Sequence, residues 1–265
     1  MIDATQTCRR EYKYLVPVNR LDDLRNACLP YLKPDAYAAK NPRGQYRVRS
    51  LYLDTAAMTC YHEKIDGKKN RNKYRIRGYE TRENDSIIFL EIKRKRQNHI
   101  AKNRAPLYYR NLPELLASSR TTDIILPMNG KDQPLDDARK FLYHYRRKNL
   151  QPVILINYDR EAFFGKFDPS FRLTFDKNIC SMMTDRLSDL FFDGDLLETL
   201  PGFFVFEIKF YNRVPSWIKS VIHDFSLHRR SLSKYIFSLD SHRQFKKSRT
   251  LRRRSLLNCG FNYAE

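Results

Sequence analysis

Charged residues stand in the middle of apolar, aromatic segments of this chain. In GFFVFEIKFYN, residues 202–212, Glu207 and Lys209 are flanked by phenylalanine, valine and isoleucine. The same Glu-x-Lys spacing occurs in three strand-like segments: Glu11 with Lys13, Glu91 with Lys93, and Glu207 with Lys209. Ionised side chains are almost never fully buried without partners. The fold must therefore provide partners for charges at the centres of several strands.

Alternating and helical patterns predict an α+β chain. Alternation with a period of two predicts strands at residues 9–16, 45–53, 72–80, 86–96, 152–160, 170–177 and 203–211. Helical spacing predicts helices at residues 19–32, 134–148, 215–224 and about 231–240, with Asn19 as the N-cap of the first. Clusters of Gly, Asn and Asp separate the second strand from the third and the third from the fourth. This arrangement favours an antiparallel meander.

The chain has 265 residues, and no linker divides residues 9–240 into two parts. We therefore expect one domain over residues 1–240, followed by a basic tail over residues 241–265. Lys and Arg number 50 against 30 Asp and Glu, which leaves a formal net charge of +20. Such a charge favours anionic partners, for example nucleotides, polyphosphate, nucleic acid or acidic lipid. For the tail, a solvated end and contact with polyphosphate or anionic lipid remain alternatives.

The five cysteines are widely spread along the chain and form no C-x-x-C pair. This spacing argues against a disulfide framework or a structural zinc site and suits a reducing compartment. The N-terminal residues lack the apolar core of a signal peptide, and no stretch approaches the roughly 18 apolar residues that a membrane span needs. We expect a cytoplasmic protein, and association with a membrane through a membrane-protein partner is left open.

Residues two apart share one face of a strand, so most of the predicted strands have a charged face. These faces carry Glu11 with Lys13, Arg47 with Arg49, Arg75 with Arg77, Glu91 with Lys93 and Lys95, Arg160, Arg172 with Asp176, and Glu207 with Lys209. One interpretation is a sheet whose charged face is solvated. The other is a barrel whose interior holds a polyanion and a divalent metal, because Arg and Lys match phosphate and Glu offers hard oxygen ligands. The pattern alone leaves both open.

A succession of short motifs resembles one known family. The motifs are REYKYLVP, SLYLDT, NKYRIRGY, FLEIKRK, INYDREAF, FRLTFDKNI, FVFEIKF and SLSKYIFSLD, in this order over about residues 9–240. Each is weak alone, but together they are similar to the VTC domain, the polyphosphate polymerase domain of the triphosphate tunnel (CYTH-like) superfamily. The resemblance implies an antiparallel β-barrel with helices packed outside. It also implies a charged tunnel that binds the triphosphate of ATP and a growing polyphosphate chain with Mn²⁺ or Mg²⁺.

Position by position, the resemblance implies roles for the charged residues. The implied catalytic residues are Arg75, Arg77, Arg160, Arg172 and Lys234. The expected substrate-binding residues are Lys13, Lys93, Lys209 and Ser233, to which we add Arg49 and Lys95 from the charged faces of their strands. Glu207 is the implied metal ligand. Glu91 and Glu11 are either further metal ligands or partners that orient Lys93 and Lys13, and we favour partners.

The resemblance predicts a polyphosphate polymerase that transfers the γ-phosphoryl group of ATP to a polyphosphate chain. Hydrolytic members of the superfamily often begin E-x-E-x-K, whereas Arg9 stands here in place of the first acid, which weighs against a metal-rich triphosphatase. The alternatives are a triphosphate or polyphosphate hydrolase on the same fold and a non-catalytic binder of polyanions. Nucleic acid is the less expected partner, although basic charge with interleaved aromatic residues also suits single-strand binding. The oligomeric state is not predicted.

Overall fold

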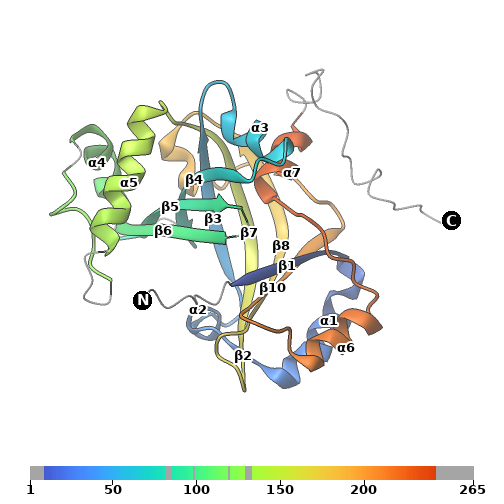
Figure 1. The fold of residues 1–265 in the computed structure, drawn as a ribbon. Coiled ribbons are helices and arrows are strands. Elements are labelled where there is room, and N and C mark those ends of the chain that lie inside the picture. Colours follow the sequence, from blue (N-terminus) through green and yellow to red (C-terminus); the bar gives the residue numbers. More distant parts are fainter. Residues whose placement is uncertain (1–8, 81–84, 98, 119, 129–132, 243–265) are drawn as a thin grey trace, which may run out of the picture.

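The computed structural model describes residues 9–80, 85–97, 99–118, 120–128 and 133–242. Within these residues a 10-stranded antiparallel sheet forms the centre of the fold (Figure 1). The strands are β1 Arg10–Pro17, β2 Leu32–Pro34, β3 Tyr46–Asp54, β4 Asn70–Tyr79, β5 Ile87–Arg96, β6 His99–Tyr108, β7 Gln151–Gly165, β8 Arg172–Met183, β9 Leu197–Glu198 and β10 Phe203–Phe210. Their hydrogen-bonded order is β1-β10-β8-β7-β3-β4-β5-β6, while β2 pairs with β7 and β9 with β8.

The strand predictions are confirmed at β1, β3, β4, β5, β7, β8 and β10. The meander is confirmed over β3 to β6, which pair antiparallel in chain order. The strand β6 was not predicted, because its first residues are exposed and lack apolar alternation. The basic segment from Lys93 to Arg104 includes the end of β5, a turn at Gln97 and the start of β6.

The helices are α1 Leu21–Cys28, α2 Ala36–Lys40, α3 Thr59–Ile65, α4 Leu112–Ser118, α5 Gln133–Arg147, α6 Ser216–Asp224 and α7 Lys234–Ser241. The predicted helix at 19–32 is divided: α1 lies between the 3-10 turns η1 Val18–Arg20 and η2 Leu29–Tyr31. Pro30 stands in η2 and has no N–H with which to continue the α-helix. Asn19 lies inside η1, so the prediction that it caps the helix was wrong; Arg20 occupies that position.

Helices cover the convex side of the sheet on two flanks (Figure 1). On one flank α4 and α5 pack on β4, β5 and β6 through a cluster that includes Ile76, Leu90, Leu107 and Phe141. On the other flank α1 and α6 pack on β1, β8 and β10 through a second apolar cluster. These clusters use the apolar faces of the strands, which leaves their charged faces on the concave side.

The sheet curls until its two ends approach each other. Glu11 Oε2 on β1 accepts a hydrogen bond from Lys93 Nζ on β5 at 3.0 Å. Within the described strands no backbone ladder joins β1 to β6, so side chains close this seam. The helix α7 covers part of the concave side, where Tyr235 and Leu239 pack among residues of β3 and β7. The expected architecture, an antiparallel barrel-like sheet with helices outside, is confirmed.

The described residues include three of the five cysteines and only the first part of the predicted tail. Cys28, Cys60 and Cys180 are free thiols, and Cys8 and Cys259 lie outside the described residues. Among the described residues, no helix combines the length and the apolar character needed to cross a membrane. The predicted basic tail also lies outside the described residues, apart from Ser241 and His242.

Candidate functional site

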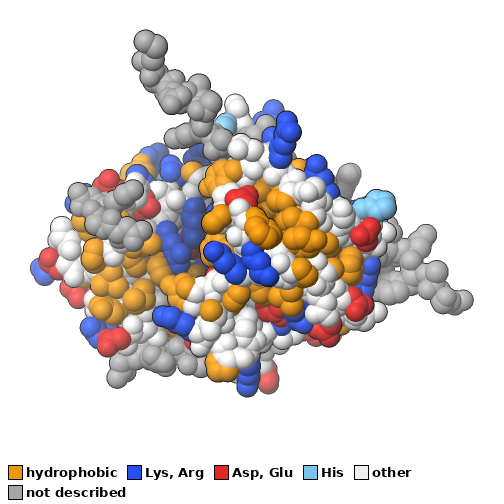
Figure 2. All heavy atoms as spheres, turned by 90° about the horizontal axis from the view of Figure 1, so that it is seen from below, with side chains coloured by type: hydrophobic (Ala, Val, Ile, Leu, Met, Phe, Trp, Pro, Cys, Tyr) orange, Lys and Arg blue, Asp and Glu red, His pale blue; other side chains and the backbone are white. Residues whose placement is uncertain are grey.

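The charged faces of the strands line the concave side of the sheet and are buried there. The exposed fraction of the side chain is 1% for Glu91, 6% for Glu207 and 0% for Asp176. A sheet face open to bulk water would leave these carboxylates exposed, so the charged-interior interpretation is right. We call this concave side the tunnel. In a view from below, Lys and Arg side chains gather in a hollow near the middle of the molecule (Figure 2).

Glu91 on β5 holds one group of tunnel cations. Its Oε2 lies 2.7 Å from Arg75 Nε and 2.6 Å from Arg75 Nη2, while its Oε1 lies 2.5 Å from Lys102 Nζ and 3.3 Å from Arg104 Nε. The strand registers place Arg75 and Arg104 directly opposite Glu91. Burial opposes ionisation, but Arg75, Arg77 and Lys102 outweigh it and hold the pKa of Glu91 well below its ordinary value. Glu91 is therefore an internal partner of β4 and β6 cations.

Arg77 is oriented mainly by neutral groups. Its Nη2 lies 3.2 Å from Ser50 Oγ on β3 and 3.2 Å from the Tyr158 hydroxyl on β7, whereas Glu91 is 3.9 Å away. Arg75 likewise donates to the Tyr52 hydroxyl at 3.0 Å. Hydroxyl partners fix a guanidinium without cancelling its charge. The remaining charge of this arginine pair is available to an anion in the tunnel.

Asp176 on β8 organises a second group. Arg160 on β7 binds it with two bonds, Nε to Oδ1 at 2.6 Å and Nη2 to Oδ2 at 2.8 Å, and Lys234 Nζ on α7 lies 2.5 Å from Oδ2. Arg160 and Lys234 outweigh the opposing effect of burial and lower the pKa of Asp176. The β7–β8 register pairs Arg160 with Asp176. Two predicted catalytic residues thus meet on one carboxylate.

Glu207 and Glu11 flank Lys13 at the seam. Lys13 Nζ lies 2.6 Å from Glu11 Oε1 and 3.8 Å from Glu207 Oε2, and Lys209 contacts Glu207 Oε1. Burial disfavours the ionised form of Glu11, but Lys13 and Lys93 outweigh it and lower its pKa to about 2. Burial lowers the pKa of Lys209 to about 8 against the effect of Glu207. Glu11 is the partner of Lys13, as the sequence favoured, but it also holds Lys93, so the expected pairing of Lys93 with Glu91 was wrong.

The N-terminus of α7 meets lysines from two strands. Ser233 caps the helix, and its Oγ accepts from Ile236 N at 3.4 Å and from Lys73 Nζ at 2.6 Å. Lys13 Nζ on β1 lies 3.4 Å from the carbonyl oxygen of Leu232. Ser233 is thus placed beside Lys73, and the following residue, Lys234, reaches Asp176.

Arg172 lies apart from these groups. Its Nη2 is 2.9 Å from Asp35 Oδ2, and Asp35 caps α2 through the backbone N–H groups of Tyr37 and Ala38. The hydroxyl of Tyr46 also donates to Asp35 at 3.1 Å. Arg172 and Lys234 therefore contact different carboxylates, Asp35 and Asp176.

Comparison with known proteins decides the family. The sequence profile of the VTC domain matches residues 8–242. The chain belongs to the VTC domain family. This confirms the resemblance found in the strand motifs, and the match covers the strands β1 to β10 that build the tunnel.

Two solved structures are similar to this VTC domain. One is described as a candidate adenylate cyclase from Bacillus halodurans, with 14% identity, a TM-score of 0.47 and coverage of 85% of this chain and 94% of that chain. The other is described as a candidate adenylyl cyclase from Hippeastrum with a dominant triphosphatase activity. It has 12% identity, a TM-score of 0.46 and coverage of 87% of this chain and 94% of that chain. Neither likeness assigns a role to a residue of this chain.

Arg49 does not point into the tunnel of the VTC domain. It lies on the convex face of β3, where its Nη1 donates to the carbonyl oxygen of Phe192 at 3.0 Å and its Nη2 contacts Asp193 at 2.5 Å. Alternation is the reason: Ser50 and Tyr52 reach Arg77 and Arg75 from the concave face, which turns Arg49 outward. Lys95 is half-buried near the β5–β6 turn, opposite Ile100.

The tunnel carboxylates are the candidate ligands for a divalent metal ion. Among the described residues, no group of three or more His, Cys, Asp or Glu side chains is arranged to hold a metal ion. Mg²⁺ and Mn²⁺ are commonly bound by one or two carboxylates together with substrate phosphates. Glu207 and Glu11 fit that mode, because both flank Lys13 on adjacent strands and supply hard oxygen donors. Glu91 fits less well, because Arg75, Lys102 and Arg104 all lie within 3.3 Å of its carboxylate.

Several tunnel residues were missed from the sequence: Asp35, Tyr52, Lys73, Lys102, Arg104 and Tyr158. The alternation rule could have found Lys73, because it precedes Arg75 by two residues and shares its face. It could also have found Lys102 and Arg104 if β6 had been recognised. Asp35, Tyr52 and Tyr158 give no sequence signal for a site, because only the fold brings them to the arginines.

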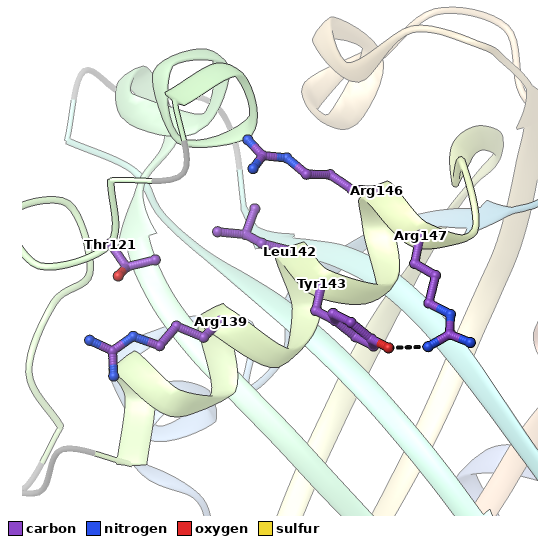
Figure 3. Close-up of a pocket in the computed structure, with 6 residues that line it drawn as sticks. All are labelled: Thr121, Arg139, Leu142, Tyr143, Arg146 and Arg147. Carbon is purple, nitrogen blue, oxygen red and sulfur yellow. Dashed lines mark hydrogen bonds between the residues drawn. The ribbon is translucent and has the colours of Figure 1, made fainter.

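A separate cavity of about 430 Å³ lies beside α5, away from the tunnel (Figure 3). It is lined by Thr121, Arg139, Leu142, Tyr143, Arg146 and Arg147. Its arginines have protein partners: Arg147 contacts the Tyr143 hydroxyl, Arg139 contacts Asp136, and Arg146 contacts carbonyl groups at the end of α4. None of the residues predicted from the sequence lies in it.

Proposed function

We propose that this VTC domain is a polyphosphate polymerase that transfers the γ-phosphoryl group of ATP to a growing polyphosphate chain. The proposal is carried by the excess of positive charge along the tunnel. The described basic side chains there are Lys13, Lys73, Arg75, Arg77, Lys93, Lys102, Arg104, Arg160, Arg172, Lys209 and Lys234, against the acids Glu11, Asp35, Glu91, Asp176 and Glu207. An elongated polyanion supplies the negative charge that such an interior lacks.

Phosphoryl transfer requires the tunnel to position the reacting phosphates and to neutralise the charge on their oxygens. An oxygen at the end of the chain attacks the γ-phosphorus of ATP, the bond from that phosphorus to the β–γ bridging oxygen breaks, and ADP leaves with the electron pair. Arg75 and Arg77, already fixed by hydroxyl groups and Glu91, hold the non-bridging oxygens. Arg160 and Lys234, fixed by Asp176, bind phosphates further along. No general base is required, because the attacking phosphate is already an anion.

A divalent cation, Mn²⁺ or Mg²⁺, belongs to this proposal, with Glu207 as its protein ligand and Glu11 as a second candidate. When bound, such an ion neutralises charge on adjacent phosphoryl oxygens. Lys13 and Lys209 keep Glu207 ionised: they outweigh burial and hold its pKa well below the ordinary value. A carboxylate in that state is ready to accept a cation.

The test is incubation of the purified chain with ATP and MnCl₂, followed by gel separation of the products and measurement of free orthophosphate. Polymer of increasing length supports the proposal. Orthophosphate without polymer indicates a hydrolase on the same fold. If neither forms and oligonucleotide binding survives Arg75→Ala and Glu207→Ala, the chain is a binder of another kind and the proposal fails.

Matched variants make the assay specific. Arg77→Met and Glu207→Gln should lose polymer formation by a factor of 100 or more, on the order of the loss when one charge-stabilising group is removed. Arg139→Gln on α5 removes the same charge from an exposed position outside the tunnel and should leave the rate unchanged. Equal rates in Arg77→Met and Arg139→Gln would contradict the tunnel mechanism.

A further inference from the structure

Lys73 stands out among the tunnel cations because it has no acidic partner. Among the described residues, no carboxylate oxygen lies within 4.0 Å of its Nζ. Its contacts are the Ser233 hydroxyl at 2.6 Å and the ring of Tyr235, whose centre is 5.6 Å away. Its neighbours differ: Lys13 and Lys93 share Glu11, and Lys234 contacts Asp176. The charged form of Lys73 therefore has no carboxylate counter-charge in contact with it.

The groups that face Lys73 are mainly cationic. Lys93 on β5 is its direct partner in the β4–β5 ladder, Lys13 approaches from β1, Lys64 from α3 and Arg71 from its own strand. From α7 come Ser233 and Tyr235, together with the N-terminus of a helix, whose dipole also favours anions. Burial, followed by these like charges, holds the pKa of Lys73 well below its ordinary value.

A phosphate that reaches this position would meet several donors at once. Lys13 and Lys73 both contact the segment that begins α7, through Leu232 O and Ser233 Oγ. Ser233 remains tied to α7 through Ile236 N, so it can keep its place when Lys73 moves to a ligand. Among the described residues, the acid that contacts both Lys13 and Lys93 is Glu11, and they engage both of its oxygens. The local shortage of negative charge therefore persists until an anion arrives.

We propose that Lys73 binds a phosphate group at the α7 end of the tunnel and takes up a proton from solvent as that phosphate binds. The inference rests on the proposed function of the tunnel as a binding site for phosphate chains. Burial and the neighbouring cations favour the neutral amine, and the amine that is neutral gains one proton and becomes an ammonium ion, which pairs with a phosphate oxygen. Substrate binding at this end thereby becomes more favourable as the pH falls.

The test is isothermal titration of the full chain with tripolyphosphate at pH 8 in two buffers of different ionisation enthalpy. The difference in heat between the buffers gives the number of protons taken up. We expect uptake in the wild-type protein and a smaller uptake in Lys73→Arg, because arginine is already charged before the ligand arrives. Other titrating lysines contribute equally to both proteins, so the difference belongs to Lys73.

A second variant measures binding. Lys73→Met should weaken the affinity for tripolyphosphate about tenfold or more, as expected for loss of a charge-assisted contact. Lys33→Met on β2, an exposed lysine outside the tunnel, should leave affinity and proton uptake unchanged. Thermal melts of both variants report whether they fold; Lys73→Met should fold, because it removes a buried group with no acidic partner.

The outcomes separate the two proposals. If the wild-type protein binds tripolyphosphate but Lys73→Arg takes up as many protons and Lys73→Met binds within twofold of wild type, the inference about Lys73 fails alone. If the wild-type protein binds no tripolyphosphate, the proposed function fails, and the inference fails with it. Reduced uptake in Lys73→Arg together with weak binding by Lys73→Met supports the inference.

Discussion

Glu11 on the end strand β1 contacts Lys93 on β5, next to the opposite end strand β6, at 3.0 Å across the curled sheet. The same carboxylate holds Lys13 at 2.6 Å. One acidic side chain therefore both closes the seam of the tunnel and keeps two of its lysines in place. This dual role explains why the Glu-x-Lys pair at the start of the chain belongs to the site as much as the pair at Glu207 and Lys209.

The seam can be tested with Glu11→Gln. Among the described residues, the substitution leaves Lys13 with Glu207, 3.8 Å away, as its acidic contact, and we expect the free energy of unfolding to fall by about 1 to 3 kcal/mol. Urea unfolding followed by circular dichroism measures this change. Glu114→Gln on α4, an exposed acid, serves as the control and should shift stability far less. A Glu11→Gln protein as stable as this control would show that the seam contact is dispensable.

Asp176→Asn should lower the free energy of unfolding more than Glu11→Gln does. It leaves the cations of Arg160 and Lys234 buried without a carboxylate, at a cost of about 3 kcal/mol or more. Because the folded-state pKa of Asp176 lies below 3.8, its stabilising contribution is present above about pH 4 and is lost as the pH falls through the lowered value. The difference between wild-type and variant unfolding energies should shrink in acid.

An added polyanion should rescue the same variant. Tripolyphosphate can replace the lost negative charge, so it should raise the melting temperature of Asp176→Asn by more than that of the wild type. The control is Asp159→Asn, which breaks a pair with Arg47 on the convex face and should show no additional rescue. Equal shifts in all three proteins would argue against an anion site beside Arg160.

Arg49 and Arg77 provide a matched pair for separating stability from binding. Arg49→Met removes contacts to Asp193 and to the Phe192 carbonyl on the convex face, and should cost about 1 to 3 kcal/mol of unfolding energy without changing the affinity for ATP. Arg77→Met should weaken ATP binding markedly. Fluorescence titration with a labelled ATP analogue, beside thermal melts, reads both effects. If Arg49→Met lost affinity for ATP, Arg49 would have to contribute to ATP binding, contrary to its position outside the tunnel.

Lys209 should make anion binding depend on pH. Burial lowers its pKa from 10.5 to about 8, so it is charged below that value and neutral above it. Affinity for tripolyphosphate should therefore fall as the pH rises from 7 to 9, and the fall should be smaller in Lys209→Arg, which stays charged. Calorimetric titrations across this pH range measure the effect. Identical pH profiles for the wild type and Lys209→Arg would show that Lys209 does not cause the pH dependence of the affinity.

Much of the tunnel was predictable because strand geometry is local. Alternation identified Arg75 with Arg77, Glu91 with Lys93, and Glu207 with Lys209 as residues that share faces, and all lie on the concave side. The same rule failed at Arg49, because nothing local says which face of β3 turns inward. The prediction that Asn19 is the N-cap of the first helix also failed, because the 3-10 turn η1 follows β1 and α1 begins only after it.

The sequence by itself determined the alternation of charged and apolar residues, and with it the α+β class, the family and most of the cations. Only the tertiary structure decided which charges meet, because partners such as Lys93 and Glu11, or Lys234 and Asp176, are far apart in the chain. These contacts matter for stability because the curled sheet buries them, and a cation that is removed from water needs a counter-charge. Lys73 is the residue for which the described fold supplies none.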